Sequence, residues 1–114
     1  MAHLLLVEDH DMVRTVLSRT IRDAGHTADS VTSKRDAERL LGAGSHALLI
    51  SNVKLPDGAG GDLARRAEKL GIEAVMLTAS PDEAAAMRVA GIVHLQRPCA
   101  LDTLKELIRR RLGA

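Results

Sequence analysis

Short apolar runs alternate with amphipathic segments along the whole chain. Continuous apolar runs, typical of strands buried on both faces, occupy residues 3–7, 47–50, 73–77 and 92–95, with a weaker run at 27–31. Between these runs apolar residues recur at spacings of three and four. That spacing predicts helices over residues 12–24, 33–41, 62–70, 81–90 and 100–112. The resulting order is strand then helix, five times over.

The ends of the expected helices carry residues that suit them. Asp11 is the expected N-cap of the first helix, and Gly25 ends it. Ser33 and Asp36 form a variant of the capping box at the start of the second helix. Pro81 fits the first turn of the fourth helix.

Five strand–helix repeats require parallel strands joined by right-handed crossovers. We therefore expect one domain over residues 1–114, an α/β three-layer sandwich around a five-stranded parallel sheet. Ligands of such sheets bind at the carboxyl ends of the strands. The polar residues at these ends are Glu8 and Asp9 after the first strand, Asn52 after the third, Thr78 after the fourth and Arg97 after the fifth.

Composition narrows the range of partners. The net charge is only +1, which gives no general attraction to nucleic acid or anionic lipid, so we expect neither DNA nor a membrane as a partner. Phe, Tyr and Trp are all absent, which argues against a base-stacking surface. The one cysteine, Cys99, is expected to be inert, and no run is long or apolar enough for a membrane span or a signal peptide. A cytoplasmic location is the default expectation.

Two further groups of residues have competing interpretations. His3, His10, His26 and His46 show no metal-ligand spacing, so we expect them to be incidental. Arg109, Arg110 and Arg111 close the last helix, where cations favour the helix dipole and keep the surface soluble. Alternatively they form a face that binds anions or a partner.

Four short motifs carry a family resemblance. They are VED at residues 7–9, NVKLPDGAGG at 52–61, LTAS at 77–80 and QRP at 96–98. Together they resemble the receiver domain of two-component response regulators, the flavodoxin-like family that includes CheY, over essentially the whole chain. The resemblance implies a (βα)5 sheet of order 2-1-3-4-5 and a signalling domain that is not an enzyme.

The resemblance also implies roles for single residues, and several are changed here. Glu8 and Asp9 match the acidic pair that binds Mg²⁺, Thr78 the switch hydroxyl, and His94 the position of the switch aromatic residue. Asn52 stands where the family has its phosphoacceptor aspartate, and Arg97 stands where it has lysine.

These departures change the expected chemistry. An amide at residue 52 cannot attack phosphorus to form an acyl phosphate. With one carboxylate missing, we expect Mg²⁺ to bind weakly to Glu8 and Asp9, or not at all. We expect Arg97 to pair with one of these acids as a bidentate fork, replacing the charge of the metal and locking the site in one state.

The leading hypothesis is a degenerate receiver that signals by protein–protein contact without phosphorylation. Its partners would be a histidine kinase, a phosphotransferase or an output protein, and it could form a homodimer through the face made by helix 4, strand 5 and helix 5. The chain is either a stand-alone receiver or part of a longer protein.

Three alternatives stay open. Asn52 is an engineered Asp→Asn change in an ordinary receiver, although the change at Arg97 argues against this. The arginines at 109–111 bind a nucleotide second messenger. Or the chain is a flavodoxin-like enzyme or flavin carrier, which is the weakest alternative because no Gly-rich phosphate loop follows the first strand.

Overall fold

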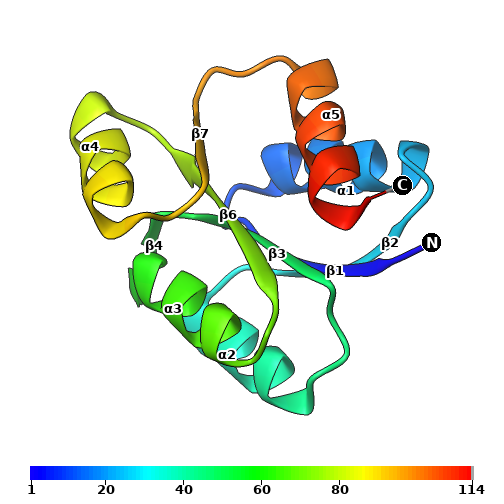
Figure 1. Cartoon of the computed structure of the whole chain (residues 1–114), viewed down its shortest axis with the longest axis horizontal. Helices are drawn as coiled ribbons and strands as arrows, with labels where there is room; N and C mark the ends of the chain where they lie inside the picture. Colours follow the sequence, from blue (N-terminus) through cyan, green and yellow to red (C-terminus); the bar gives the residue numbers. More distant parts are fainter. Residues whose placement is uncertain (114) are drawn as a thin grey trace.

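The computed structural model describes residues 1–113 and has a flavodoxin-like fold (Figure 1). Five parallel strands form one sheet, as the sequence predicted, and their order β2-β1-β3-β6-β7 is the one that the family resemblance implied. The strands are β1 (His3–Val7), β2 (Thr27–Val31), β3 (Leu48–Asn52), β6 (Glu73–Thr78) and β7 (His94–Gln96). The helices are α1 (Asp11–Asp23), α2 (Lys34–Ala43), α3 (Gly61–Lys69), α4 (Pro81–Ala90) and α5 (Leu101–Leu112).

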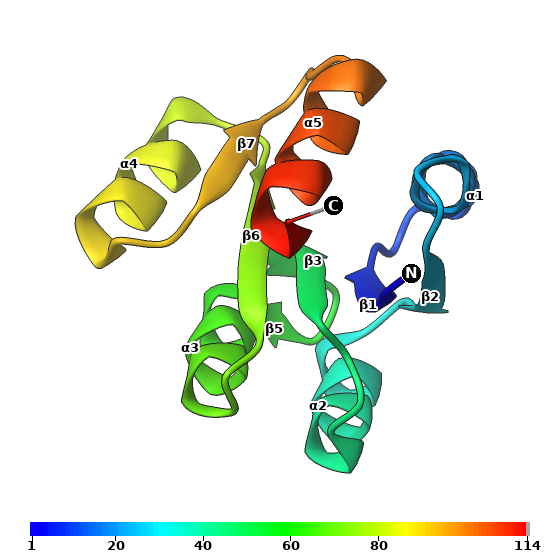
Figure 2. The ribbon, with the colours of Figure 1, turned by 45° about the vertical axis from the view of Figure 1, so that its right-hand side comes forward.

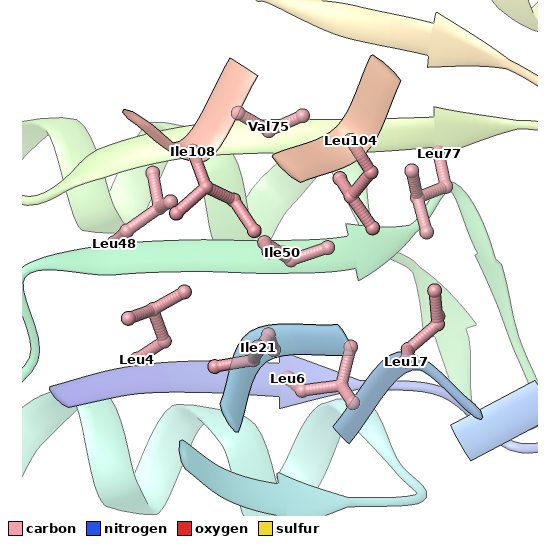
Figure 3. Close-up of a cluster of buried hydrophobic side chains, with 10 residues drawn as sticks. All are labelled: Leu4, Leu6, Leu17, Ile21, Leu48, Ile50, Val75, Leu77, Leu104 and Ile108. Atoms are coloured by element: carbon pink, nitrogen blue, oxygen red, sulfur yellow. The ribbon is translucent and has the colours of Figure 1, made fainter. Parts of the chain in front are cut away.

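Helices cover both faces of the sheet (Figure 2). One face packs on α1 and α5 through a cluster that includes Leu6, Ile21 and Ile108 (Figure 3). The other face packs on α2 and α3 through Leu5, Leu41 and their neighbours, and α4 adds a smaller cluster on the same side. The three clusters consist of Leu, Ile, Val, Ala and Met side chains, since the chain has no aromatic residues.

Several element boundaries differ from the sequence prediction. β3 continues through Asn52, because Asn52 pairs with Leu77 of β6 in the sheet register. β7 is shorter than expected and begins at His94. The N-cap of α1 is His10, whose ring accepts a hydrogen bond from the Val13 N–H, and not Asp11, which is the first helical residue.

The loop after β3 forms a small hairpin that the sequence did not predict. Its strands, β4 (Lys54–Leu55) and β5 (Gly58–Ala59), have two residues each, too few to show a hydrophobic period. At its end the chain passes very close to itself. A Cβ atom at Gly60 would overlap the backbone oxygen of Asn52, so this position requires glycine.

Asp57, at the tip of this hairpin, caps α2. Its carboxylate accepts hydrogen bonds from the backbone N–H groups of Lys34 (2.8 Å) and Arg35 (2.9 Å). The expected cap Ser33 is confirmed, since its hydroxyl accepts from the N–H of Asp36. The N–H groups of Arg35 and Lys34 lower the pKa of the Asp57 carboxyl. The hairpin is thereby tied to the helix that precedes β3.

Within residues 1–113, no helix is long and apolar enough to cross a membrane.

Candidate functional site

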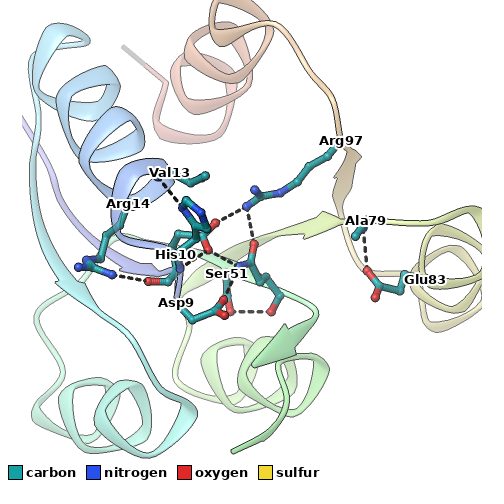
Figure 4. Close-up of polar contacts among 10 residues, drawn as sticks. Asp9, His10, Val13, Arg14, Ser51, Ala79, Glu83 and Arg97 are labelled. Atoms are coloured by element: carbon teal, nitrogen blue, oxygen red, sulfur yellow. Dashed lines mark hydrogen bonds and ion pairs between the residues drawn. The ribbon is translucent and has the colours of Figure 1, made fainter. Parts of the chain in front are cut away.

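Four of the expected site residues, Glu8, Asp9, Asn52 and Arg97, meet at the carboxyl ends of the strands. Nη2 of Arg97, which follows β7, lies 2.5 Å from Oε1 of Glu8 and 2.5 Å from Oδ1 of Asn52 (Figure 4). Asn52 ends β3, and Glu8 directly follows β1. Residues from three strand ends therefore form one hydrogen-bonded cluster.

The amide of Asn52 bridges the arginine and the acids. Its Nδ2 donates to Oε2 of Glu8 (2.7 Å) and to Oδ1 of Asp9 (3.2 Å), while its Oδ1 accepts from Arg97. A flipped amide would set its N–H groups against the guanidinium and its oxygen against two carboxylates. The network thus fixes the orientation of the Asn52 side chain.

Glu8 is the buried centre of the cluster. Its side chain is only 2% exposed, whereas that of Arg97 is 29% exposed. Oε2 also accepts the N–H of His10 at 3.0 Å, so both carboxylate oxygens are used. A buried carboxylate needs a countercharge and hydrogen bonds, and this one has both.

The contact of Arg97 differs from the expected bidentate fork. A single nitrogen, Nη2, reaches both Glu8 and Asn52. The reason is that the second oxygen of Glu8 already accepts from the Asn52 amide and from the His10 backbone. The prediction that Arg97 pairs with one of the two acids agrees with the structure. The predicted bidentate geometry of that pair is wrong.

The acidic pair that would bind Mg²⁺ is already engaged in hydrogen bonds. This ion prefers oxygen ligands in near-octahedral geometry. Here the oxygens of Glu8 and Asp9 that face residue 52 accept N–H donors from Asn52, and the remaining Glu8 oxygen pairs with Arg97. The guanidinium supplies the positive charge that a metal would otherwise bring.

Thr78 and His94 lie outside this network. Thr78 is fully buried and its hydroxyl donates to the backbone oxygen of Leu95 on β7 (3.3 Å). The half-buried ring of His94 lies with Nδ1 3.1 Å from the backbone oxygen of Ile92. Thr78 therefore contacts the backbone of β7, and His94 contacts the backbone just before it.

An apolar groove borders Arg97 on the side of α1. It has a volume of about 560 Å³ and is lined by Met12, Val16, Cys99 and Leu101 among others. Met12 is 72% exposed. Cys99 is half-buried on this groove.

The three arginines near the end of α5 already have acidic neighbours. Both Arg109 and Arg110 contact Glu106, with the Arg109 Nε at 3.0 Å from Oε2 and the Arg110 Nε at 3.5 Å from Oε1. The hydrogen bond from Arg109 lowers the pKa of the Glu106 carboxyl. Arg111 lies 3.9 Å from Glu73 of β6. Part of the positive charge that the sequence suggested is thus neutralised within the domain.

Residues 4–109 match the family model of the response regulator receiver domain. The chain is 35% identical to the transcriptional regulatory protein BasR of Escherichia coli (strain K12), over 96% of this chain and 51% of that protein. It is 27% identical to the transcriptional regulatory protein TcrA of Mycobacterium tuberculosis (strain ATCC 25618 / H37Rv), over 93% of this chain and 44% of that protein. The chain therefore spans about half the length of these curated relatives.

Solved structures share the fold. A CheY-like receiver domain protein from Methanospirillum hungatei JF-1 superposes with a TM-score of 0.88 at 22% identity, over 99% of this chain and 94% of that one. The non-phosphorylated HemR receiver domain from Leptospira biflexa superposes with a TM-score of 0.86 at 23% identity, over 100% of this chain and 96% of that one. With the family model matching nearly its full length, the chain belongs to the response regulator receiver domain family.

Proposed function

We propose that this receiver domain signals by protein–protein contact without phosphorylation of residue 52. Receiver domains act within two-component systems, where they contact histidine kinases and output domains. In this chain the residue that would take the phosphoryl group is an amide, which forms no acyl phosphate. The surface presented to a partner is then set by the resting structure of the domain.

The observation that carries the proposal is the bridge from Arg97 to Glu8 and Asn52. This bridge places a cation against the acids and a hydrogen bond across the strand ends. A phosphorylated receiver obtains both of these from groups outside its own chain. Opening this bridge would leave the Glu8 carboxylate buried without its countercharge, which is unfavourable. The site is therefore held in one arrangement.

The partner surface is the α4–β7–α5 face, which is also the surface of a homodimer if one forms. A shallow groove of about 390 Å³ lies there, lined by Leu95 of β7 and by Thr103, Leu107 and Arg110 of α5. Val89 of α4 is 90% exposed. These features combine apolar contact area with charge, as transient protein interfaces do.

The direct test is treatment with acetyl phosphate and Mg²⁺, followed by intact-protein mass spectrometry. The expected result is no mass increase of one phosphate, and an NMR titration should give no sub-millimolar Mg²⁺ affinity. Phosphate on residue 52 would refute the proposal. Capture of a histidine kinase, phosphotransferase or output protein by the wild-type domain, reduced when Arg109, Arg110 and Arg111 are changed to Ala, would support it.

The alternative of an engineered Asp→Asn change predicts a different result. An otherwise ordinary receiver should recover phosphorylation from the single reversion Asn52→Asp. The contact between Arg97 and Asn52 favours a pair of residues that function together, so we expect the single reversion to be insufficient. The nucleotide alternative receives less support, because Glu106 and Glu73 already engage the arginines of α5.

A further inference from the structure

Two histidines and an aspartate meet near the amino-terminal ends of the strands, away from Asn52. His3 is the first residue of β1, Asp29 lies on the edge strand β2, and His46 lies in the segment between α2 and β3. In the sheet register His3 pairs with Thr27, so Asp29 stands two positions further on the same face. The expectation that these histidines are incidental does not describe this arrangement.

The three side chains converge on one point. Oδ2 of Asp29 lies 3.0 Å from Nε2 of His3 and 2.8 Å from Nε2 of His46. One ligand atom from each residue lies within 4.8 Å of the other two. A tetrahedral Zn²⁺ ion with bonds of about 2.0–2.2 Å separates its ligand atoms by about 3.3–3.5 Å. The two distances from Asp29 are therefore about half an ångström shorter than the ligand spacing of such an ion.

The surroundings hold the ligands while leaving a path from solvent. The His46 side chain is 2% exposed, whereas those of His3 and Asp29 are 36% and 44% exposed. The two imidazole rings stack with centroids 5.1 Å apart. Nδ1 of His3 lies 2.7 Å from the hydroxyl of Thr27, which can accept its proton and leave Nε2 free to bind a metal.

Hydrogen bonding alone leaves this cluster incomplete. Among residues 1–113, the buried Nδ1 atom of His46 has no hydrogen-bond partner. The other ring nitrogen of His46, Nε2, is directed at Asp29. Oδ2 of Asp29 is therefore a contact that both histidines share.

We propose that His3, Asp29 and His46 form a binding site for a divalent transition-metal ion such as Zn²⁺, with water completing the coordination. Two imidazoles and one carboxylate suit Zn²⁺ and exclude Mg²⁺, which prefers oxygen ligands alone. The ion would join β1, β2 and the segment before β3 at a place that the phosphorylation chemistry of receivers does not use.

The test is calorimetric titration of the purified domain with Zn²⁺, together with the visible absorption of added Co²⁺. The expected result is one saturable site per chain, four-coordinate Co²⁺ bands, and a melting temperature that rises with Zn²⁺ concentration. His3→Gln and Asp29→Asn, both at partly exposed positions, should each weaken binding by more than about tenfold. The imidazole NMR signals of His3 and His46 should shift.

His10→Gln, at the exposed histidine that caps α1, is the matched control and should bind Zn²⁺ as the wild type does. The proposal is overturned if the wild type shows no saturable Zn²⁺ binding, if both His3→Gln and Asp29→Asn retain full affinity, or if His10→Gln abolishes it.

Discussion

A single buried carboxylate, that of Glu8, governs the pocket at the scale of residues. Its side chain is 2% exposed and receives hydrogen bonds from Arg97, from Asn52 and from the backbone of His10. Charge at this depth is stable only with a partner. For that reason the two departures from the family pattern fit together. Asn52 removes a negative charge beside Glu8, and Arg97 provides a fixed positive charge.

Arg97→Met should destabilise the domain by about 2–4 kcal/mol, because it removes the countercharge while keeping most of the aliphatic volume. The free energy of unfolding in urea measures this effect. Arg66→Met is the control, since Arg66 pairs with Glu38 at an exposed site and should cost less than about 1 kcal/mol. An equal loss of unfolding free energy in the two variants would contradict the stabilising role assigned to the Arg97–Glu8 pair.

Asn52→Asp changes one atom of the side chain and reverses its hydrogen bonding. The Nδ2 donor, 2.7 Å from Glu8, becomes an acceptor facing a carboxylate. We expect a loss of about 1–3 kcal/mol without metal. The same variant should bind Mg²⁺ more tightly than the wild type, so that Mg²⁺ raises its melting temperature and not that of the wild type. A variant as stable as the wild type in EDTA would contradict this.

The hairpin after β3 is the feature that matters most at the scale of elements. It connects the strand that carries Asn52 to two neighbours, because Asp57 caps α2 and Gly60 packs against the backbone of Asn52. Lys34 of α2 also pairs with Asp62 of α3 at 2.9 Å. These contacts, and not strand length, hold the loop in place.

Gly60→Ala tests the close approach in this hairpin. The added methyl group would overlap the backbone oxygen of Asn52, so we expect a destabilisation of about 1–3 kcal/mol and shifted amide NMR signals in the hairpin. Gly42→Ala in α2 is the matched control. That position has open space and helical backbone, so alanine should stabilise the domain by about 0.5–1 kcal/mol.

Asp57→Asn tests the cap on α2 through its pH dependence. A carboxyl whose pKa is lowered on folding stabilises the folded state above its unfolded pKa of about 3.9, and this contribution is lost as pH falls through the folded value. The wild type should therefore be more stable than the variant near neutral pH, and the two should converge in acid. Thermal melts of the wild type, Asp57→Asn and the control Asp23→Asn measure the difference.

The sequence predicted the secondary structure best where apolar residues follow a single helix or strand period. The strands of the sheet centre and the helices on its faces each bury a clear apolar pattern, and the strand ends carrying Glu8, Asn52 and Arg97 follow from that topology. The contact of His3 with Asp29 and His46 was not predicted, because it depends on the register of β1 with β2 and on the path of the segment before β3, which the apolar pattern does not give. The short hairpin and the single-nitrogen bridge of Arg97 depend on backbone paths that residue patterns do not encode.

At the scale of the whole molecule, the proposal predicts that the phosphorylation switch can be rebuilt with two changes. The double variant Asn52→Asp/Arg97→Lys restores the carboxylate and replaces the bridging guanidinium by a compact, mobile ammonium. The loop from Val53 to Gly60 and the buried Thr78 are unchanged in it. We expect Mg²⁺-dependent incorporation of one phosphate from acetyl phosphate, at a rate well above that of either single variant.

The same double variant shows how far the site communicates. Arg97 directly follows β7 and its backbone N–H donates to Thr78 of β6, so a change in its side chain is linked by the main chain to the α4–β7–α5 face. The phosphorylated double variant should show amide NMR shift changes that extend from residue 52 into β7 and α5. The wild type treated in the same way should show none. Shifts confined to the loop around residue 52 would mean that this face no longer responds to the site. In that case the domain would signal only through the surface that it presents without phosphorylation.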